Sequence, residues 1–514
     1  MIKPLLSTVL ATLLSATVFA QDLSFSRCFG DNMVLQRGMA VPVWGTAGPG
    51  DKVLVAFQQQ RLSATADAQG RWQVQLAALE AIATPQTLEV SRATGAPVVV
   101  KNVVVGDVLL LAGQSNMGWT VAQSQGGPEF AATATWPWLR YLPVPRATVD
   151  TAASNLSPET TGWHVSDPNK VRWMSAIGVW TAEHLHAAHG VPIGLIQTAV
   201  GGTYTESWLP SAWFRDVPDL KVLRERWQKD LAEYPTRHAA WQVRKTEFDA
   251  QVASAKAAGR QPPIADDDLL NGPMGPTHCR RPSALFNGVI APVAPFAIKA
   301  VVWYQGEGNT SATLASVHEA SLKAILAGWR NAWKRDDLPF VIIQLPGREV
   351  PRTVDGWARV RAAQAKVVME DRQAALVATL DEPGKEIHPI DKRPVAERVA
   401  RALRRLVDGD DIAGTPLVVE YRQDGKHVIL RFQDTGNGLR FADSAVSGFE
   451  VAGANGEFRP ANATLKGNDS IVVACDGLTT PICLRYAWAG TTSASLRNSE
   501  GIPAAAFAVT IERP

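Results

Sequence analysis

Four short polar segments each follow an apolar run that is typical of a buried strand. The apolar runs cover residues 103–112, 191–196, 298–304 and 374–380. The segments that follow them contain, in chain order, Ser115, Gly201 and Gly202, Asn309, and finally Asp381, Glu386 and His388. Ligands of an open α/β sheet bind outside the carboxyl ends of its strands. We therefore expect these residues to gather at one edge of a sheet.

A serine, a histidine and a carboxylate at one edge indicate nucleophilic attack on an acyl group. A serine hydroxyl is a weak nucleophile until an imidazole accepts its proton, and a carboxylate can hold that imidazole in the right tautomer. The developing oxyanion needs donors, for which the backbone N–H of Ser115, an N–H of the glycine pair and the amide of Asn309 are candidates. Of the nine histidines, only His388 follows a strand end with carboxylates close by.

Each of these residues also has an ordinary structural explanation. Ser115 is suited to be a helix N-cap, Gly201 and Gly202 to form a turn, and Asn309 to cap the helix expected after it. Ser115 is not part of a Gly-x-Ser-x-Gly elbow, because residue 117 is Met. This argues against the α/β-hydrolase fold.

The hydrophobic pattern divides the chain into three regions that would position this chemistry. Residues 21–100 consist of short alternating runs separated by turn residues, which predicts a small β-sandwich. Residues 101–407 alternate apolar runs with helical patterns, which predicts a parallel sheet covered on both faces. Within this region, residues 210–280 predict an insertion with a charged pair of helices, at 220–234 and 236–258. Residues 408–514 return to a β pattern.

The first twenty residues are typical of an export signal. Lys3 provides the charge, residues 5–14 form a short apolar run, and small residues precede Gln21. The run is shorter than the ~20 apolar residues that a membrane span needs. We therefore expect residues 1–20 to be a signal peptide and the mature protein to be secreted or periplasmic.

An exported protein can hold disulfides, and the chain has four cysteines. Cys475 and Cys483 flank a short segment between two β-like runs, which makes a hairpin disulfide plausible. The sequence gives no pairing for Cys28 and Cys279. It also lacks the cysteine and histidine spacings of metal sites, so we expect neither a metal nor an organic cofactor.

The composition argues against partners that bind through bulk charge. Lys plus Arg number 51 and Asp plus Glu 49, which gives a net charge of +2. A nucleic acid or an anionic membrane would favour a basic excess. The 17 Trp beside 6 Tyr suit stacking on an uncharged ligand, although we assign most of them to the core.

The same segments resemble the sialate O-acetylesterase family, carbohydrate esterases within the SGNH hydrolases. The resemblance rests on Gly-Gln-Ser-Asn-Met at 113–117, Gly-Gly-Thr-Tyr-Thr-Glu-Ser-Trp at 201–208, Trp-Tyr-Gln-Gly-Glu at 303–307 with Asn309, and Ile-His-Pro-Ile-Asp-Lys at 387–392. Further similar blocks occur at 31–37, 43–45, 285–288, 485–488 and 498–503, so nearly the whole mature chain is covered. The resemblance implies an SGNH-type, doubly wound parallel sheet flanked by N-terminal and C-terminal β domains.

Carried over block by block, the resemblance makes Ser115 the nucleophile and His388 the general base and acid. Gly202 and Asn309 become oxyanion donors together with the N–H of Ser115. The family usually places Asp three residues before the histidine, but residue 385 is Lys. We prefer Asp381 as the orienting acid, with Glu386 as the alternative, and a Ser–His dyad without an acid is also compatible with the sequence. Gly308 stands where many relatives carry Ser.

The sequence thus predicts a serine esterase that removes O-acetyl groups from a carbohydrate through an acetyl-enzyme. Acetylated sialic acid and plant polysaccharides such as xylan or xyloglucan are both candidate substrates. A general carboxylesterase or lipase would use the same machinery. A non-catalytic carbohydrate-binding protein would explain the Trp content but not the serine and histidine, and a glycosidase would leave the serine idle.

Overall fold

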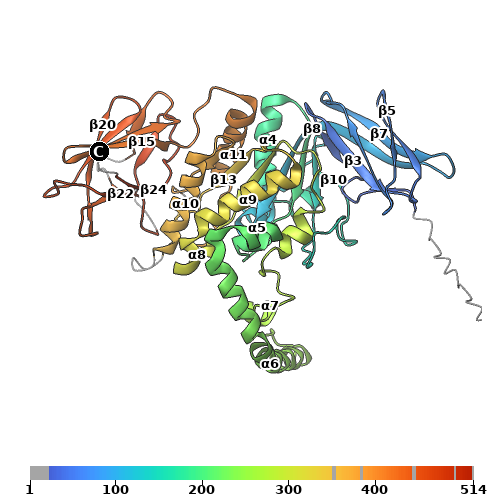
Figure 1. Ribbon diagram of the computed structural model, residues 1–514, viewed down its shortest axis with the longest axis horizontal. Coiled ribbons are helices and arrows are strands. Elements are labelled where there is room, and N and C mark those ends of the chain that lie inside the picture. Colours follow the sequence, from blue (N-terminus) through green and yellow to red (C-terminus); the bar gives the residue numbers. More distant parts are fainter. Residues whose placement is uncertain (1–21, 350–354, 382–385, 443–446, 491–493, 512–514) are drawn as a thin grey trace, which may run out of the picture.

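The computed structural model describes residues 22–349, 355–381, 386–442, 447–490 and 494–511. The predicted signal peptide and Lys385 lie outside these ranges. Figure 1 shows a central α/β region between two β regions that lie at opposite ends of the long axis. The mixed α/β architecture with additional β-sheets agrees with the sequence prediction at this level.

The central sheet is built around the long strand β8. The strands of this region are β8 (Val98–Gly113), β9 (Leu139–Pro143), β10 (His164–Val165), β11 (Ile193–Gln197), β12 (Ala300–Tyr304), β13 (Phe340–Ile343) and β14 (Ala374–Val377). Their spatial order is β10-β9-β11-β8-β12-β13-β14, and all neighbouring pairs are parallel except β10 with β9. The chain leaves β8 first towards β9 and β11 and later towards β12. The carboxyl end of β8 therefore faces connections from both sides.

Strands of the central sheet are apolar throughout because both faces are covered. Along β8, Leu110 and Ala112 belong to one hydrophobic cluster, while Leu109 and Leu111 belong to a second cluster on the other face. Alternate residues of β12 and β13 divide between the same two clusters. This alternation is what a period of two residues produces in a strand buried on both sides.

Helices cover the two faces of the sheet. They are α1 (Ser115–Gly118), α2 (Gly127–Ala132), α3 (Pro168–Val171), α4 (Ala176–His189), α5 (Ser211–Asp216), α6 (Lys221–Ala257), α7 (Asp267–Asn271), α8 (Ala312–Ser316), α9 (His318–Trp333), α10 (Gly356–Glu370) and α11 (Arg393–Leu403). The apolar side chains of α9 join the first cluster, and those of α4 and α11 join the second. α4 and α11 also touch directly, because Thr181 Oγ1 donates to the carbonyl of Ala396 at 3.1 Å.

The two flanking regions consist of strands that pair antiparallel, except for β2. The N-terminal strands are β1 (Ser24–Phe25), β2 (Val34–Gln36), β3 (Val41–Thr46), β4 (Lys52–Phe57), β5 (Gln60–Thr65), β6 (Arg71–Leu76) and β7 (Ile82–Arg92). The C-terminal strands are β15 (Leu417–Asp424), β16 (His427–Gln433), β17 (Leu439–Phe441), β18 (Phe449–Ala452), β19 (Phe458–Pro460), β20 (Asn462–Lys466), β21 (Ser470–Ala474), β22 (Cys483–Tyr486), β23 (Leu496–Asn498) and β24 (Phe507–Thr510). The first half of β8 pairs with β7 and with β2, the latter in parallel. The N-terminal β region is therefore continuous with the central sheet.

The predicted helical pair of the insertion is one helix. α6 runs from Lys221 to Ala257 with Pro235 inside it. A proline in a helix interior removes one backbone hydrogen bond and bends the helix, but it does not always end it. Figure 1 shows α6 running away from the sheet and then changing direction, with α7 beside its second part. The prediction of a break at residue 235 is wrong.

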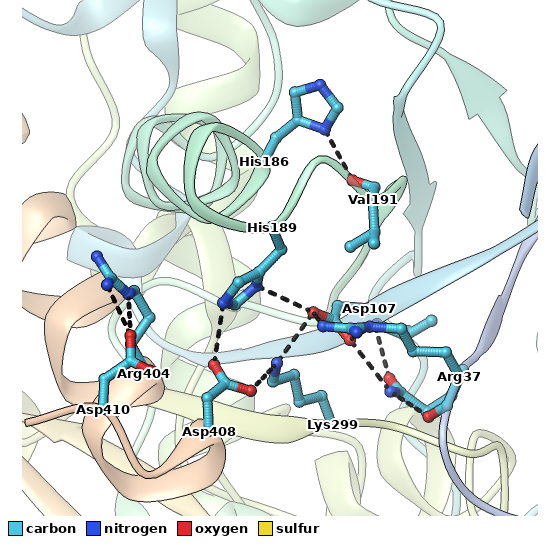
Figure 2. A network of polar contacts seen from close by, with 11 residues as sticks. Arg37, Asp107, His186, His189, Val191, Lys299, Arg404, Asp408 and Asp410 are labelled. Carbon is cyan, nitrogen blue, oxygen red and sulfur yellow. Dashed lines mark hydrogen bonds and ion pairs between the residues drawn. The ribbon is translucent and has the colours of Figure 1, made fainter. Parts of the chain in front are cut away.

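A buried cluster of charges ties the N-terminal β region to the opposite end of the strands from Ser115 (Figure 2). Asp107 of β8 accepts hydrogen bonds from Arg37 Nε at 2.8 Å and from Lys299 Nζ at 2.9 Å. Lys299 also donates to Asp408 Oδ1 at 2.6 Å, and His189 at the end of α4 lies 3.4 Å from Asp408. Burial opposes ionisation of Asp107, but the hydrogen bond from Arg37 and the charge of Lys299 hold the pKa of its carboxyl below the usual value.

The cysteines do not form the disulfide that the hairpin spacing suggested. All four cysteines are free thiols. The thiol of Cys475 is directed to the carbonyl of Pro460, 3.5 Å away, instead of to Cys483. Cys28 is fully buried, and this burial raises the pKa of its thiol to about 12.

Candidate active site

Ser115 and His388 meet at the carboxyl end of the central sheet. Ser115 is the first residue of α1, directly after β8, and His388 follows β14. His388 Nε2 lies 2.7 Å from Ser115 Oγ, which is hydrogen-bond distance. Both side chains are half-buried, so they can be reached from solvent. The predicted encounter of these two residues, 273 positions apart in the chain, is present in the structure.

The position of Ser115 depends on a close approach between β8 and β12. Gly113 has φ +132°, and a Cβ atom there would lie 2.2 Å from the carbonyl oxygen of Tyr304. Only glycine fits this place. The next residue, Gln114, donates its N–H to the same carbonyl at 3.0 Å. The chain then turns into α1, which presents Ser115 above the strand ends.

Two contacts fix the position of His388, one to its imidazole and one to the backbone beside it. Its imidazole is stacked on Trp119, with ring centroids 4.9 Å apart and an angle of 24°. Asn116 Nδ2 donates to the carbonyl of the preceding residue, Ile387, at 2.9 Å. Burial lowers the pKa of His388, and the nearby charges of Lys392 and Arg348 lower it further. A neutral imidazole is the form that can accept a proton from Ser115.

Asn116 connects this histidine segment to two buried charges. Its Nδ2 also donates to Glu307 Oε1 at 2.6 Å, and its Oδ1 accepts from Lys392 Nζ at 2.6 Å. All three side chains are buried. Burial raises the pKa of Glu307, although the hydrogen bond from Asn116 and the charge of Lys392 oppose this rise. One amide thus links the segments after β8, β12 and β14.

The glycine pair at the end of β11 lies beside the serine. A Cβ atom at Gly201 would be 3.5 Å from Ser115 Cβ. Gly202 has φ +67°, and a Cβ atom there would be 2.8 Å from Arg280 Nη2. The turn is therefore packed between the serine and a guanidinium.

Asn309 is buried and its amide orientation is fixed. Oδ1 accepts from the backbone N–H of Thr205 at 3.0 Å and from Gln305 Nε2 at 2.7 Å. The amide nitrogen is therefore the donor end of the group, and it donates to Glu206 Oε2 at 3.4 Å. Glu206 is itself paired with Arg226.

The preferred orienting acid, Asp381, is bonded to arginines and not to the histidine. Both oxygens of Asp381 are held by Arg398, at 2.8 and 2.6 Å, and Arg497 adds a contact at 3.2 Å. Glu386 is exposed, and its charge raises the pKa of His388, but burial and the charges of Lys392 and Arg348 lower it more. Among the described residues, no carboxylate accepts a hydrogen bond from His388. The described geometry is that of a Ser–His pair, which the sequence had left as an alternative.

Sequence reasoning did not single out Asn116, Trp119 or Lys392. Asn116 and Lys392 both stand inside the segments that carry the family resemblance, and Trp119 follows the first of these by two residues. Their position next to Ser115 and His388 was the available signal. Within the described ranges, no three His, Cys, Asp or Glu side chains lie together as a metal site would require, and no helix is long and apolar enough to cross a membrane.

A serine hydroxyl bonded to an imidazole at the ends of parallel strands defines the class of serine hydrolases. Comparison with known proteins then specifies the kind of hydrolase. Residues 215–389 match the model of the family described as "Carbohydrate esterase, sialic acid-specific acetylesterase". The human sialate O-acetylesterase is 25% identical over 511 residues, covering 90% of this chain and 87% of the human protein, and the orangutan (Pongo abelii) protein matches equally.

Comparison with a solved structure also indicates a carbohydrate acetylesterase. The crystal structure of a carbohydrate acetylesterase from Xanthomonas citri superposes with a TM-score of 0.77 at 28% identity, covering 95% of this chain and 99% of that one. These findings confirm the predicted resemblance to the sialate O-acetylesterase family. The protein is a carbohydrate O-acetylesterase.

Proposed function

We propose that the enzyme deacetylates its sugar through Ser115 and His388. The observation that carries this proposal is the 2.7 Å contact between Ser115 Oγ and His388 Nε2 at the sheet edge. Ser115 Oγ attacks the acetyl carbonyl carbon while its proton moves to Nε2. The tetrahedral intermediate collapses, the bond from the acetyl carbon to the sugar oxygen breaks, and Nε2 returns its proton to that oxygen. Water then attacks the acetyl-serine and loses its proton to Nε2. The bond from the acetyl carbon to Ser115 Oγ breaks, Nε2 returns its proton to Oγ, and acetate leaves.

The oxyanion is stabilised in this proposal by three donors. These are the backbone N–H groups of Ser115 and Gly202 and the amide of Asn309. The placement of Gly201, the neighbour of Gly202, against Ser115 supports the assignment, as does the fixed orientation of the Asn309 amide. Loss of one such donor typically reduces kcat by ~10²–10³.

We assign the orientation of His388 to its neighbours instead of to a triad acid. Trp119 stacks on the imidazole, and Asn116 holds the Ile387 carbonyl. Asp381 then has a structural function, joining α11 to the C-terminal β region through Arg398 and Arg497. Glu386 acts only through its charge.

The parallel strand order around β8 supports an SGNH-type, doubly wound core. We also propose export to the periplasm or the medium, supported by the N-terminal sequence alone. The substrate is an O-acetylated sialic acid or an acetylated polysaccharide such as xylan or xyloglucan. A neutral His388 that can act as the base, and a Ser115 that solvent can reach, are compatible with either substrate.

The proposed function is tested by measuring acetate release from acetylated xylan, acetylated xyloglucan and O-acetylated sialic acid. An aryl acetate and an aryl octanoate are assayed beside them. We expect acetate release from at least one carbohydrate and a preference for aryl acetate over octanoate. Preference for the octanoate without activity on any carbohydrate would favour a lipase and contradict the proposal.

A further inference from the structure

A cleft of about 390 Å³ lies between the second part of α6 and the segment that precedes the π-helical turn at Phe286–Ile290. Its volume falls within the range of sites that hold a small-molecule ligand. It is far larger than an acetyl group requires. The side chains that bear on its chemistry are Tyr204, Arg237, Trp241, Arg244, Asp268 and Arg280.

α6 directs one face of its second part towards this cleft. Arg237, Trp241 and Arg244 are spaced by four and three residues, which places them on the same side of a helix. Gly272 lies against the indole of Trp241, since a Cβ atom there would lie 3.5 Å from the ring. Trp241 Nε1 is covered and has no hydrogen-bond partner among the described residues. Because Nε1 is covered, what Trp241 offers to the cleft is the flat apolar surface of its indole.

Two residues of the cleft also contact the segments that carry the glycine pair and Asn309. Arg280 lines the cleft and would contact a Cβ atom at Gly202 at 2.8 Å. The neighbouring Gly201 lies against Ser115. Tyr204 also lines the cleft, and its ring lies beside Gly308, where it would be 3.2 Å from a Cβ atom. Arg280 and Tyr204 thus lie between the cleft and the segments beside Ser115.

The chemistry of the cleft fits an uncharged sugar. Sugars present apolar C–H faces, which pack on aromatic rings, and hydroxyl groups, which both donate and accept hydrogen bonds. The arginines that α6 contributes already have anionic partners. Arg237 is paired with Asp230 and Glu233, and Arg244 with Asp266 at 3.0 Å. Ion pairs of this kind bind hydroxyls without demanding a net negative ligand.

We propose that this cleft is a glycan subsite that binds unacetylated sugar residues of an uncharged, acetylated oligosaccharide, with Trp241 as the stacking platform. This proposal rests on the proposed esterase function of Ser115. It makes the α6 insertion the element that favours an oligosaccharide over a free acetylated monosaccharide, and it favours neutral chains over sialic acid.

The test compares Trp241→Ala with Val243→Ala, a matched control because Val243 is 60% exposed on the same helix. The substrates are neutral acetylated xylo-oligosaccharides, O-acetylated sialic acid and 4-nitrophenyl acetate. For Trp241→Ala we expect about a tenfold rise in KM for the oligosaccharides, and less than a twofold change for 4-nitrophenyl acetate. Trp241→Phe keeps a ring and should recover most of the affinity. Val243→Ala should match the wild type on all substrates.

The outcomes separate this proposal from the proposed function. If the wild type releases no acetate from any carbohydrate, the proposed function itself is wrong. If the wild type is active but Trp241→Ala equals Val243→Ala on the oligosaccharides, only the subsite is wrong. Equal losses on 4-nitrophenyl acetate and on the oligosaccharides would show a general structural defect and also overturn the subsite. A wild-type preference for O-acetylated sialic acid would overturn its assignment to uncharged chains.

Discussion

Replacing Asn116 by Ala should slow catalysis, although we do not propose that its side chain contacts the reacting atoms. The substitution removes the hydrogen bond from Nδ2 to the Ile387 carbonyl, which fixes the backbone next to His388. It also removes the bonds to Glu307 and from Lys392. Asn116 is therefore a positioning residue in this account, and its effect should fall on kcat.

The size of the effect follows from the bonds that are lost. A hydrogen bond to a backbone carbonyl contributes a net ~0.5–1.5 kcal/mol. At ~1.4 kcal/mol per factor of ten, losing this free energy lowers the proportion of correctly placed His388 by about 2- to 12-fold. Glu307 Oε1 loses its buried donor, so we also expect unfolding to become easier by ~1–3 kcal/mol.

The assay is steady-state hydrolysis of 4-nitrophenyl acetate, with thermal unfolding measured on the same samples. The matched control is Asn287→Ala. Asn287 is equally buried and donates to the carbonyl of Asp150 at 2.8 Å, away from Ser115 and His388. We expect Asn116→Ala to lower kcat about three- to tenfold with KM unchanged, and Asn287→Ala to lower only stability. An unchanged kcat in Asn116→Ala would show that the hydrogen bond to the Ile387 carbonyl does not position His388. A loss of kcat above ~10³-fold would indicate that Asn116 contacts the reacting atoms directly.

Two further substitutions test the electrostatics. The positive charge of Arg348 helps to lower the pKa of His388, whose neutral form is the base, so wild-type activity should fall with acid only below the usual histidine pKa of ~6.5. Arg348→Gln should move this acid limb of kcat/KM to higher pH, and a shift to lower pH in the pH–rate profile would contradict the assignment. Lys299→Met leaves Asp107 without its buried ammonium partner and should destabilise the fold by ~3–5 kcal/mol. Calorimetry should show a lower Tm with kcat unchanged, and an unaltered Tm would show that the buried charge cluster does not contribute.

The contact between Ser115 and His388 could be predicted from sequence because it depends on a general property of parallel sheets. Ser115 and His388 each follow an apolar strand, and strand ends of a parallel sheet meet at one edge. The apolar runs themselves were recognisable because both faces of the strands are buried. The family resemblance then supplied the roles that we propose for Gly202 and Asn309, which strand positions alone could not assign.

The orienting group could not be predicted, since it depends on contacts between distant residues. Asp381 stands at a strand end, as a triad acid would, but Arg398 and Arg497 lie 17 and 116 residues away and hold its oxygens. Lys392 reaches Asn116 across 276 residues. No local sequence pattern predicts such pairs. The continuous α6 helix was missed for a different reason, because Pro235 lowers helix propensity while the surrounding turns keep the helix intact.

The most direct measurement of the central claim is acetate release from an acetylated carbohydrate by Ser115→Ala. The matched control is Ser124→Ala, a buried serine whose hydroxyl donates to the Thr120 carbonyl at 3.0 Å. Removal of a serine nucleophile can reduce kcat by ~10⁶. We expect Ser115→Ala to lose activity on this scale and Ser124→Ala to retain it. A loss of only a few-fold in Ser115→Ala would contradict the account, because another group would then have to attack the ester.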